Sequence, residues 1–149
     1  MKNTKIIWGF FSAAVLSLIF ALNTGANDTK IFEIREKMFI QQCNDIYFNA
    51  DEYLGRTVKL EGIFGEFPNV IGGEPEQYVY RNAPGCCGYD GMAGFRVLLD
   101  DCPAPKQYAW VEATGTVEIT SSGTDDEDVV LRLSSLKVTD KRGSEFVTN

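Results

Sequence analysis

The chain has 149 residues, of which 44% are hydrophobic and 23% charged, and its formal net charge is −7. These values predict one globular domain with a short appendage, and they argue against nucleic-acid binding because no basic patch offsets the repulsion of phosphates. The chain contains no histidine, which excludes Ser–His and Cys–His catalytic pairs and a histidine zinc triad. It also contains no P-loop or dinucleotide fingerprint, so we expect a protein that is not an enzyme.

The appendage is an apolar segment at the N-terminus. Lys2 and Lys5 precede an uncharged run over residues 6–22. This pattern predicts a secretory signal over residues 1–26, while the length of the run also suits an uncleaved membrane anchor. In both cases we expect the rest of the chain to be extracytoplasmic, either secreted or anchored to the membrane. Without the two lysines its charge changes from −7 to −9.

The next two segments are short. Residues 30–42 have apolar spacings that suit a helix as well as strands, and we favour an extended segment that packs across the domain. Residues 49–55 predict one helical turn. Asn49 is placed to cap this turn and Gly55 to end it.

Alternating apolar residues then mark five strands separated by turn residues. The strands are predicted at residues 57–67, 76–82, 94–100, 109–119 and 128–138. Gly62 and Gly115 lie inside the longest of them, where glycine is typical of a bulge or a barrel bend. The pattern predicts an all-β domain, a small five-stranded OB-like barrel at residues 30–147, behind the N-terminal leader or anchor helix. Its inward residues are predicted to be Val58, Leu60, Phe64, Phe95, Val97, Leu99, Ala109, Val111, Ala113, Val117, Ile119, Leu131, Leu133, Leu136 and Val138.

Residues 80–95, "YRNAPGCCGYDGMAGF", predict a glycine-rich loop between two strands, with Cys86 and Cys87 at its tip. The two thiols and Asp90 are candidate ligands of a thiophilic ion such as zinc, with Cys102 or water as the fourth ligand. The spacing does not match a paired CxxC framework. Disulfides are the competing interpretation in an exported domain, and they would join Cys43 with Cys102 or either of these with the adjacent pair. The residues alone leave both interpretations open.

Other polar and aromatic residues have simpler interpretations. The acidic run at residues 124–128 predicts a solvated hairpin loop rather than a calcium site. Arg81 and Arg96 flank the cysteine loop, and we expect them to pair with acids rather than to tune a thiol. Three aromatic residues are expected to pack in the barrel rather than to form an open stacking platform. They are Tyr78, Tyr80 and Trp110.

Several segments together resemble the uncharacterised bacterial YcgQ-like family. They are "EKMFI" (36–40), "NDIYFNADEYLGRTVKLEGIF" (44–64), "APGCCGYDGMAGFRVL" (83–98), "WVEATGTVE" (110–118) and "LRLSSLKV" (131–138). The resemblance implies an OB-like extracytoplasmic domain whose gene commonly lies beside that of a predicted permease, in neighbourhoods that suggest zinc homeostasis. Cys86, Cys87 and Asp90 lie within the recognised motifs, whereas Cys43 and Cys102 lie outside them. The resemblance therefore favours a separate role for the CCGYDG loop, with a disulfide between Cys43 and Cys102.

We accordingly expect an accessory binding module of a transport or metal-homeostasis system, which holds a thiophilic ion and has a membrane permease as its partner. The alternative is a disulfide-stabilised module of the cell envelope that binds a protein or a carbohydrate. In that alternative the four cysteines have a purely structural role.

Overall fold

The structure, a computed structural model, describes residues 30–70, 72–121 and 127–148. In chain order its elements are β1 (Phe32–Glu33), the 3-10 helix η1 (Glu36–Met38), α1 (Phe39–Phe48), α2 (Ala50–Tyr53), β2 (Thr57–Phe67), β3 (Glu76–Gly85), β4 (Gly88–Leu98), β5 (Trp110–Ser121) and β6 (Glu127–Val138). The predicted leader at residues 1–26 lies outside the described residues. Within the described part of the chain, no helix has the length and apolar content needed to cross a membrane.

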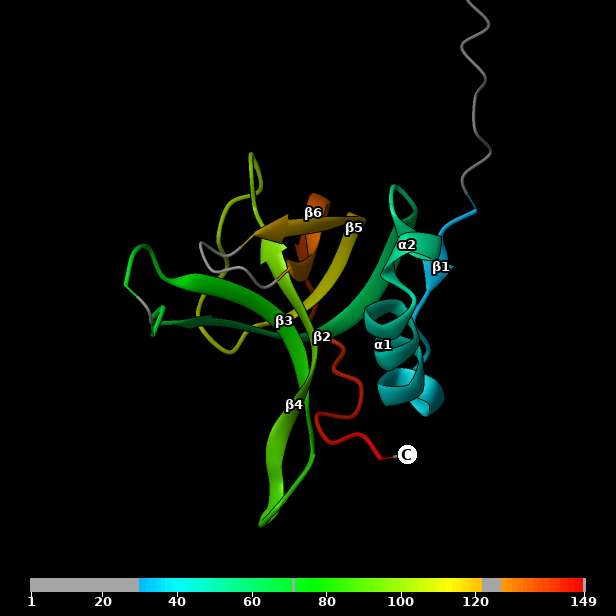
Figure 1. Ribbon diagram of the computed structural model, residues 1–149. Helices are drawn as coiled ribbons and strands as arrows, with labels where there is room; N and C mark the ends of the chain where they lie inside the picture. The colour runs from blue at the N-terminus through cyan, green and yellow to red at the C-terminus, as the bar shows by residue number, and fades with distance from the viewer. Residues whose placement is uncertain (1–29, 71, 122–126, 149) are drawn as a thin grey trace, which may run out of the picture.

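Six strands form one sheet, and five of them close into a ring (Figure 1). The strand order is β1-β2-β3-β4-β6-β5, and β5 pairs back with β2. Neighbouring strands of the ring are antiparallel, except that β4 and β6 pair in parallel. The ring confirms the predicted five-stranded, OB-like arrangement. The two-residue strand β1 adds to β2 in parallel.

The segment before the ring is helical where the sequence favoured an extended chain. Only β1 is extended, and η1 and α1 follow it beside the ring (Figure 1). The buried side chains of α1 are Phe39, Ile40, Cys43 and Ile46. Their spacing is that of one helical face. The prediction was wrong because residues 30–42 contain only the first half of this pattern.

The helical turn predicted near Asn49 is confirmed as α2, but its predicted cap is not formed. Gly55 follows the helix with φ of +74°. The Asn49 side chain makes no capping hydrogen bond, and its Nδ2 donates to Asp45 Oδ1 at 2.8 Å instead. The Tyr53 hydroxyl donates to the other oxygen of the same carboxylate. Asp45 of α1 therefore ties the two helices together.

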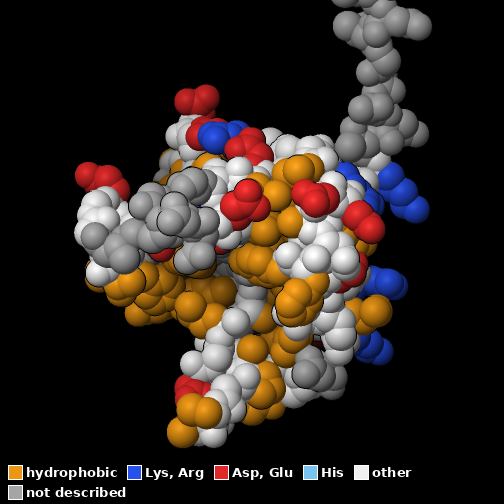
Figure 2. All heavy atoms as spheres, in the orientation of Figure 1, with side chains coloured by type: hydrophobic (Ala, Val, Ile, Leu, Met, Phe, Trp, Pro, Cys, Tyr) orange, Lys and Arg blue, Asp and Glu red, His pale blue; other side chains and the backbone are white. Residues whose placement is uncertain are grey.

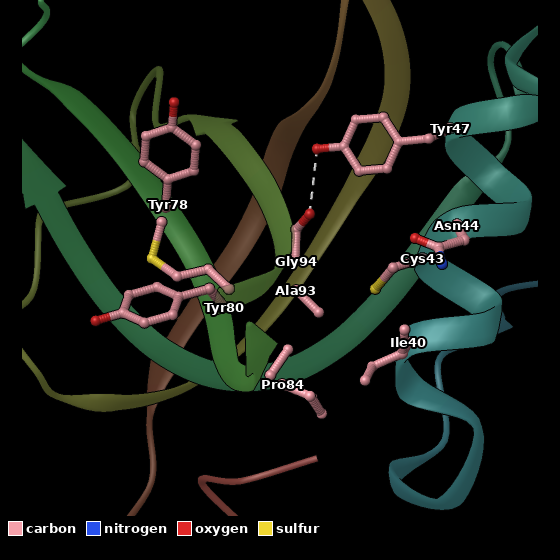
Figure 3. A pocket seen from close by; sticks show the side chains of 11 residues that line it. Ile40, Cys43, Asn44, Tyr47, Tyr78, Tyr80, Pro84, Ala93 and Gly94 are labelled. Atoms are coloured by element: carbon pink, nitrogen blue, oxygen red, sulfur yellow. Dashed lines mark hydrogen bonds between the residues drawn. The ribbon is translucent and has the colours of Figure 1, made fainter. Parts of the chain in front are cut away.

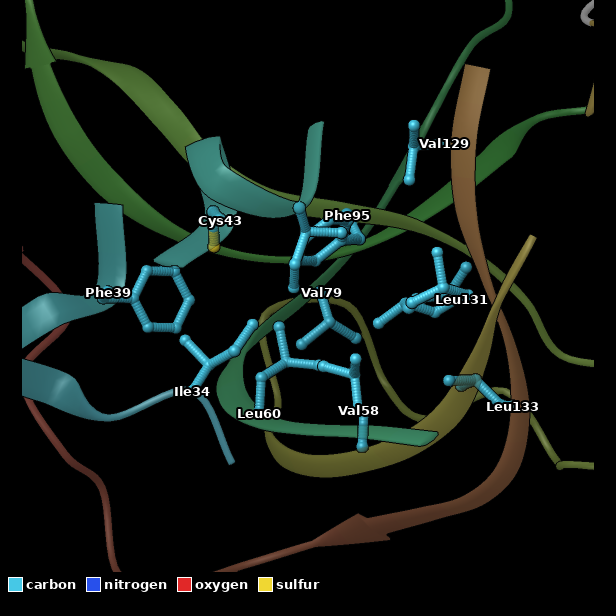
Figure 4. Packing of buried hydrophobic residues seen from close by; sticks show 14 of the residues in the cluster. Ile34, Phe39, Cys43, Val58, Leu60, Val79, Phe95, Val129, Leu131 and Leu133 are labelled. Atoms are coloured by element: carbon cyan, nitrogen blue, oxygen red, sulfur yellow. The ribbon is translucent and has the colours of Figure 1, made fainter. Parts of the chain in front are cut away.

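Apolar side chains from the strands and from α1 fill the interior (Figure 4). The largest fully buried ones are Phe39, Phe64, Phe95, Ile46, Leu60 and Leu131. The predicted inward faces are confirmed in the main, with one clear exception. Val138 is 62% exposed. It ends β6 beyond the residues that pair with β4, so that β5 alone flanks it.

The two glycines predicted to bend the barrel act in different ways. The pairing of β5 with β6 shifts register between Thr114 and Gly115, which is a bulge. At Gly62 the backbones approach closely, since a Cβ there would lie 2.6 Å from the Tyr80 carbonyl oxygen. β2 pairs with β5 up to Ile63 and with β3 from Ile63 onwards, so its bend here helps to close the ring.

The glycine-rich segment is a β-hairpin rather than the predicted loop. β3 continues to Gly85 and β4 begins at Gly88, so the turn contains only Cys86 and Cys87. This confirms that the cysteine pair lies at the turn between two strands. β4 reaches β6 only over residues 96–98 and β3 pairs with β2 only over residues 76–80, so the end of the hairpin that carries the turn projects from the ring (Figure 1). The pair is thus presented at the end of a projecting arm.

Candidate metal centre

The hairpin turn brings the side chains of Cys86, Cys87 and Asp90 together. The two Sγ atoms are 3.3 Å apart, and the Cys86 thiol donates to Asp90 Oδ2 at 3.7 Å. One ligand atom from each residue lies within 4.8 Å of the other two. Among the described residues, these three form a group that could hold a metal ion, and they are the ligands that the sequence predicted.

Local backbone geometry explains why this turn carries glycine on both sides of the cysteines. The Cys87 N–H donates to Asp90 Oδ1 at 3.4 Å, which folds the carboxylate back over the turn. A Cβ at Gly85 would collide with that carboxylate. Gly88 has φ of +129°, a conformation that residues with a side chain rarely adopt. The glycines therefore allow Asp90 to approach the thiols.

The electrostatics of the group stabilise a proton on Cys86, or a cation in its place, over a bare thiolate. The neighbouring Cys87 thiol and, second, the Asp90 carboxylate raise the pKa of Cys86 by hydrogen bonding, with a smaller effect from desolvation. A thiophilic cation can take the place of the thiol proton, because thiolates bind such ions directly and release protons as they do so. All three side chains are exposed, so an ion reaches them from solvent without rearrangement of the barrel.

The two arginines near the cysteine hairpin in sequence bind acids elsewhere, as expected. Arg81 is only 3% exposed, and its Nη1 lies 3.0 Å from Glu36 Oε2. Arg96 Nε donates to Asp128 Oδ2 at 2.6 Å. Asp128 belongs to the acidic run but lies in β6 with Glu127, and residues 124–126 of that predicted loop lie outside the described residues. Neither guanidinium is hydrogen-bonded to the thiols.

The other two cysteines lie apart from this group. Cys43 is buried on α1, and Cys102 is half-buried in the connection between β4 and β5. Both pack against the main hydrophobic core. All four cysteines are thiols in this structure, so a Cys43–Cys102 disulfide remains a prediction. Cys102 does not belong to the group of three ligands, and the structure does not support it as the fourth.

The three aromatic residues considered as a stacking platform belong to a small second core. Tyr80 and Trp110 are buried with Ile63, and Tyr78 packs against them half-buried. Trp110 is only 2% exposed, so its ring offers no open face for a ligand to stack upon. The expected packing role is confirmed for these residues.

A pocket of about 420 Å³ lies between α1 and the β3–β4 hairpin (Figure 3). Its lining includes Cys43 and Tyr47 from α1, Tyr78 from β3 and Met92 from β4. No local sequence pattern predicts this pocket, because it exists only where a helix packs against the hairpin. The helical spacing of the apolar residues after residue 38 is the signal that could have revealed it. No lining residue carries a formal charge.

Together these features define an OB-like β-barrel domain that carries an exposed dithiol–carboxylate group on a projecting hairpin. Comparison with protein families shows which family the domain belongs to. Residues 20–148 match the DUF1980 C-terminal domain, and because this match covers most of the chain, the protein belongs to that family. No curated protein matches the chain.

Proposed function

We propose that this domain is an extracytoplasmic accessory module of a transport or metal-homeostasis system, and that it binds zinc through Cys86, Cys87 and Asp90. The observation that carries the proposal is the convergence of their three ligand atoms within 4.8 Å. Two thiolates and one carboxylate suit Zn²⁺, which accepts sulfur and oxygen ligands in tetrahedral geometry. The extracytoplasmic location is supported by the apolar run at residues 6–22, and the partner permease by the resemblance to YcgQ-like proteins.

The position of the group supports a binding role rather than a structural one. The ligands lie on an arm that contributes little to the interior of the ring, and their side chains are exposed. Figure 2 shows hydrophobic side chains, a class that includes cysteine there, together with an acidic group on the projecting hairpin. An ion bound here would neutralise part of the negative charge of an acidic protein. Because the ligands are exposed, neither the ion nor the thiolates are buried, and the cost of desolvating them is small.

Metal analysis of the protein tests this proposal directly. Protein purified without chelator and kept reduced is expected to contain one zinc ion per chain. The variant Cys86→Ser/Cys87→Ser should lose the ion and keep the unfolding curve of the metal-free native protein, because both side chains are exposed. The matched control is Cys102→Ser, which removes a thiol outside the group and should retain the ion. Metal-free native protein, or equal binding by the double variant, contradicts the proposal.

The alternative is an envelope module that binds a protein or carbohydrate and contains only structural cysteines. The pocket between α1 and the hairpin favours it, because Tyr47, Tyr78 and Tyr80 supply ring surface and hydroxyl groups there. A free-thiol count separates the two functions. Four oxidised cysteines without metal support the alternative, and a reduced pair with stoichiometric metal supports the first function.

A further inference from the structure

The candidate metal centre supplies fewer protein ligands than zinc uses. Structural zinc sites are closed by four protein ligands, whereas sites with three keep the fourth position open for water or another molecule. In the described part of the chain, the group consists of Cys86, Cys87 and Asp90 and includes no fourth cysteine or acid. An ion held by these three residues therefore keeps one coordination position for a ligand from outside.

The open position is accessible because the site lies at the tip of the hairpin. The three ligands are exposed, and the turn between β3 and β4 is only two residues long. Strand pairing continues to Gly85 and Gly88 on either side of it. The ligands are thus held by a paired backbone, and none of the other described elements lies over them. Another molecule can approach the ion without displacing any part of the barrel.

We propose that the site passes its ion to a thiolate-bearing acceptor, whose sulfur enters the open fourth position. This inference rests on the proposed metal-binding function. When the ion binds, two thiols lose their protons, and two thiolates and one carboxylate give the complex a charge of about −1. The acceptor thiol then releases its own proton to solvent, displaces the water from the fourth position and forms a third metal–sulfur bond.

The ligand set also determines which bond breaks first during transfer. Carboxylate oxygen is a harder ligand than thiolate and holds a thiophilic ion less firmly. The bond to Asp90 is therefore the first to be replaced when a second acceptor thiolate arrives. The two thiolates of the hairpin leave afterwards, as further ligands of the acceptor or water take their places on the ion, and each takes up a proton from solvent. No electron is transferred in any step, because zinc has no redox chemistry.

Cobalt(II) provides a spectroscopic test on the full chain, kept reduced with a phosphine. It replaces zinc and gives a near-ultraviolet thiolate-to-metal band whose intensity follows the number of cobalt–sulfur bonds. Addition of the monothiol 2-mercaptoethanol should raise the band about 1.5-fold, from two bonds to three. For Asp90→Asn the same addition should raise it about twofold, from two bonds to four. Cys102→Ser, the control, should behave as the native protein does.

The outcomes separate this inference from the function on which it rests. If cobalt(II) produces no thiolate-to-metal band, the metal-binding proposal itself is contradicted. A band that is present and does not change with 2-mercaptoethanol means a closed site, and it overturns the transfer inference alone. A second measurement follows zinc transfer to a chromophoric chelator. The rate should rise in proportion to the monothiol concentration, and a rate independent of that concentration also overturns the inference.

Discussion

Asp90 affects the reactivity of Cys86 even without a metal ion. Its carboxylate accepts the hydrogen bond of the Cys86 thiol, and its second oxygen accepts from the Cys87 N–H. A negative charge beside a thiol stabilises the protonated form, which is why Asp90 contributes to the raised pKa of Cys86. The same carboxylate is the oxygen ligand of the proposed site, so it opposes ionisation only until a cation arrives.

The substitution Asp90→Asn should therefore make Cys86 more reactive in the metal-free protein. Removal of the carboxylate lowers the pKa of Cys86, although the larger contribution from Cys87 remains. The thiolate is the nucleophile, so iodoacetamide should alkylate the variant faster than the native protein at neutral pH. Asp51→Asn, an exposed acid in α2, is the control. Equal or slower alkylation of Asp90→Asn, measured by mass spectrometry, contradicts the prediction.

Cys43 is a buried thiol, whereas Cys86 is exposed. Desolvation rather than hydrogen bonding is the main cause of the raised pKa of Cys43. Burial raises its pKa to about 12, since the charged thiolate is poorly solvated in the core. The folded protein therefore keeps a proton that the unfolded chain loses first. The resulting stability is fully present below about pH 8.5 and is lost as the pH rises towards the folded pKa.

Alkaline denaturation tests this linkage. With the cysteines reduced, the free energy of unfolding of the native protein should decrease by up to about 1.4 kcal/mol per pH unit from this thiol above pH 9 or so. Cys43→Ala removes the titrating group and should show a shallower decrease. Urea unfolding at a series of pH values gives both slopes. If the slopes are equal, Cys43 is not the buried thiol that the structure describes.

Among the secondary-structure elements, α1 connects the barrel to its projecting hairpin. One face of the helix packs into the core through Phe39 and Ile46, and the other face reaches solvent. Tyr47 stacks on Phe95 with ring centroids 5.0 Å apart and donates its hydroxyl to the Gly94 carbonyl oxygen. The helix thus fixes one wall of the pocket against β4.

Two phenylalanines at opposite ends of α1 provide a matched test of this arrangement. Phe39 is fully buried, and Phe39→Ala should lower the free energy of unfolding by about 3–5 kcal/mol, because it leaves a cavity. Phe48 is 84% exposed, and Phe48→Ala should change it by less than about 0.5 kcal/mol. Chemical denaturation measures both. Similar costs for the two variants would show that α1 does not pack as described.

At the scale of the whole molecule, Arg81 joins segments that are distant in sequence. Its Nε donates to the Glu61 carbonyl oxygen of β2, and its Nη1 binds Glu36 and the Ser144 carbonyl oxygen. The guanidinium also lies over two rings, 4.8 Å from the Phe39 centroid and 4.9 Å from the Trp110 centroid. One buried side chain therefore connects the N-terminal helices, the ring and the C-terminal segment.

Replacement of this arginine should destabilise the whole domain. Arg81→Met should cost about 3 kcal/mol, because it breaks a buried network and leaves carbonyl oxygens unpaired. Arg132 also binds two acids, Asp100 and Glu118, but its side chain is 42% exposed. Arg132→Met should therefore cost less than about 1 kcal/mol. Thermal unfolding compares the two variants, and a larger loss for Arg132→Met contradicts this account.

The sequence by itself determined the positions of the ring strands and the candidate metal group, although β4 begins at Gly88 rather than at residue 94. Alternation along a strand is a local pattern, so β2 was predicted with its observed bounds, and β5 and β6 to within two residues at each end. The three ligands were predictable for the same reason. They lie within five residues of one another, and a turn is enough to bring them together.

Tertiary structure alone decided the features that depend on residues far apart in the chain. α1 was misassigned because its first residues suit both a helix and a strand, and packing against β4 selects the helix. The pocket beside α1 depends on that choice. The role of Arg81 required Glu36, Glu61 and Ser144 to meet, and no local pattern encodes such a meeting. Local patterns determine which residues can form a strand or a turn, whereas burial against distant segments determines which of the possible structures is stable.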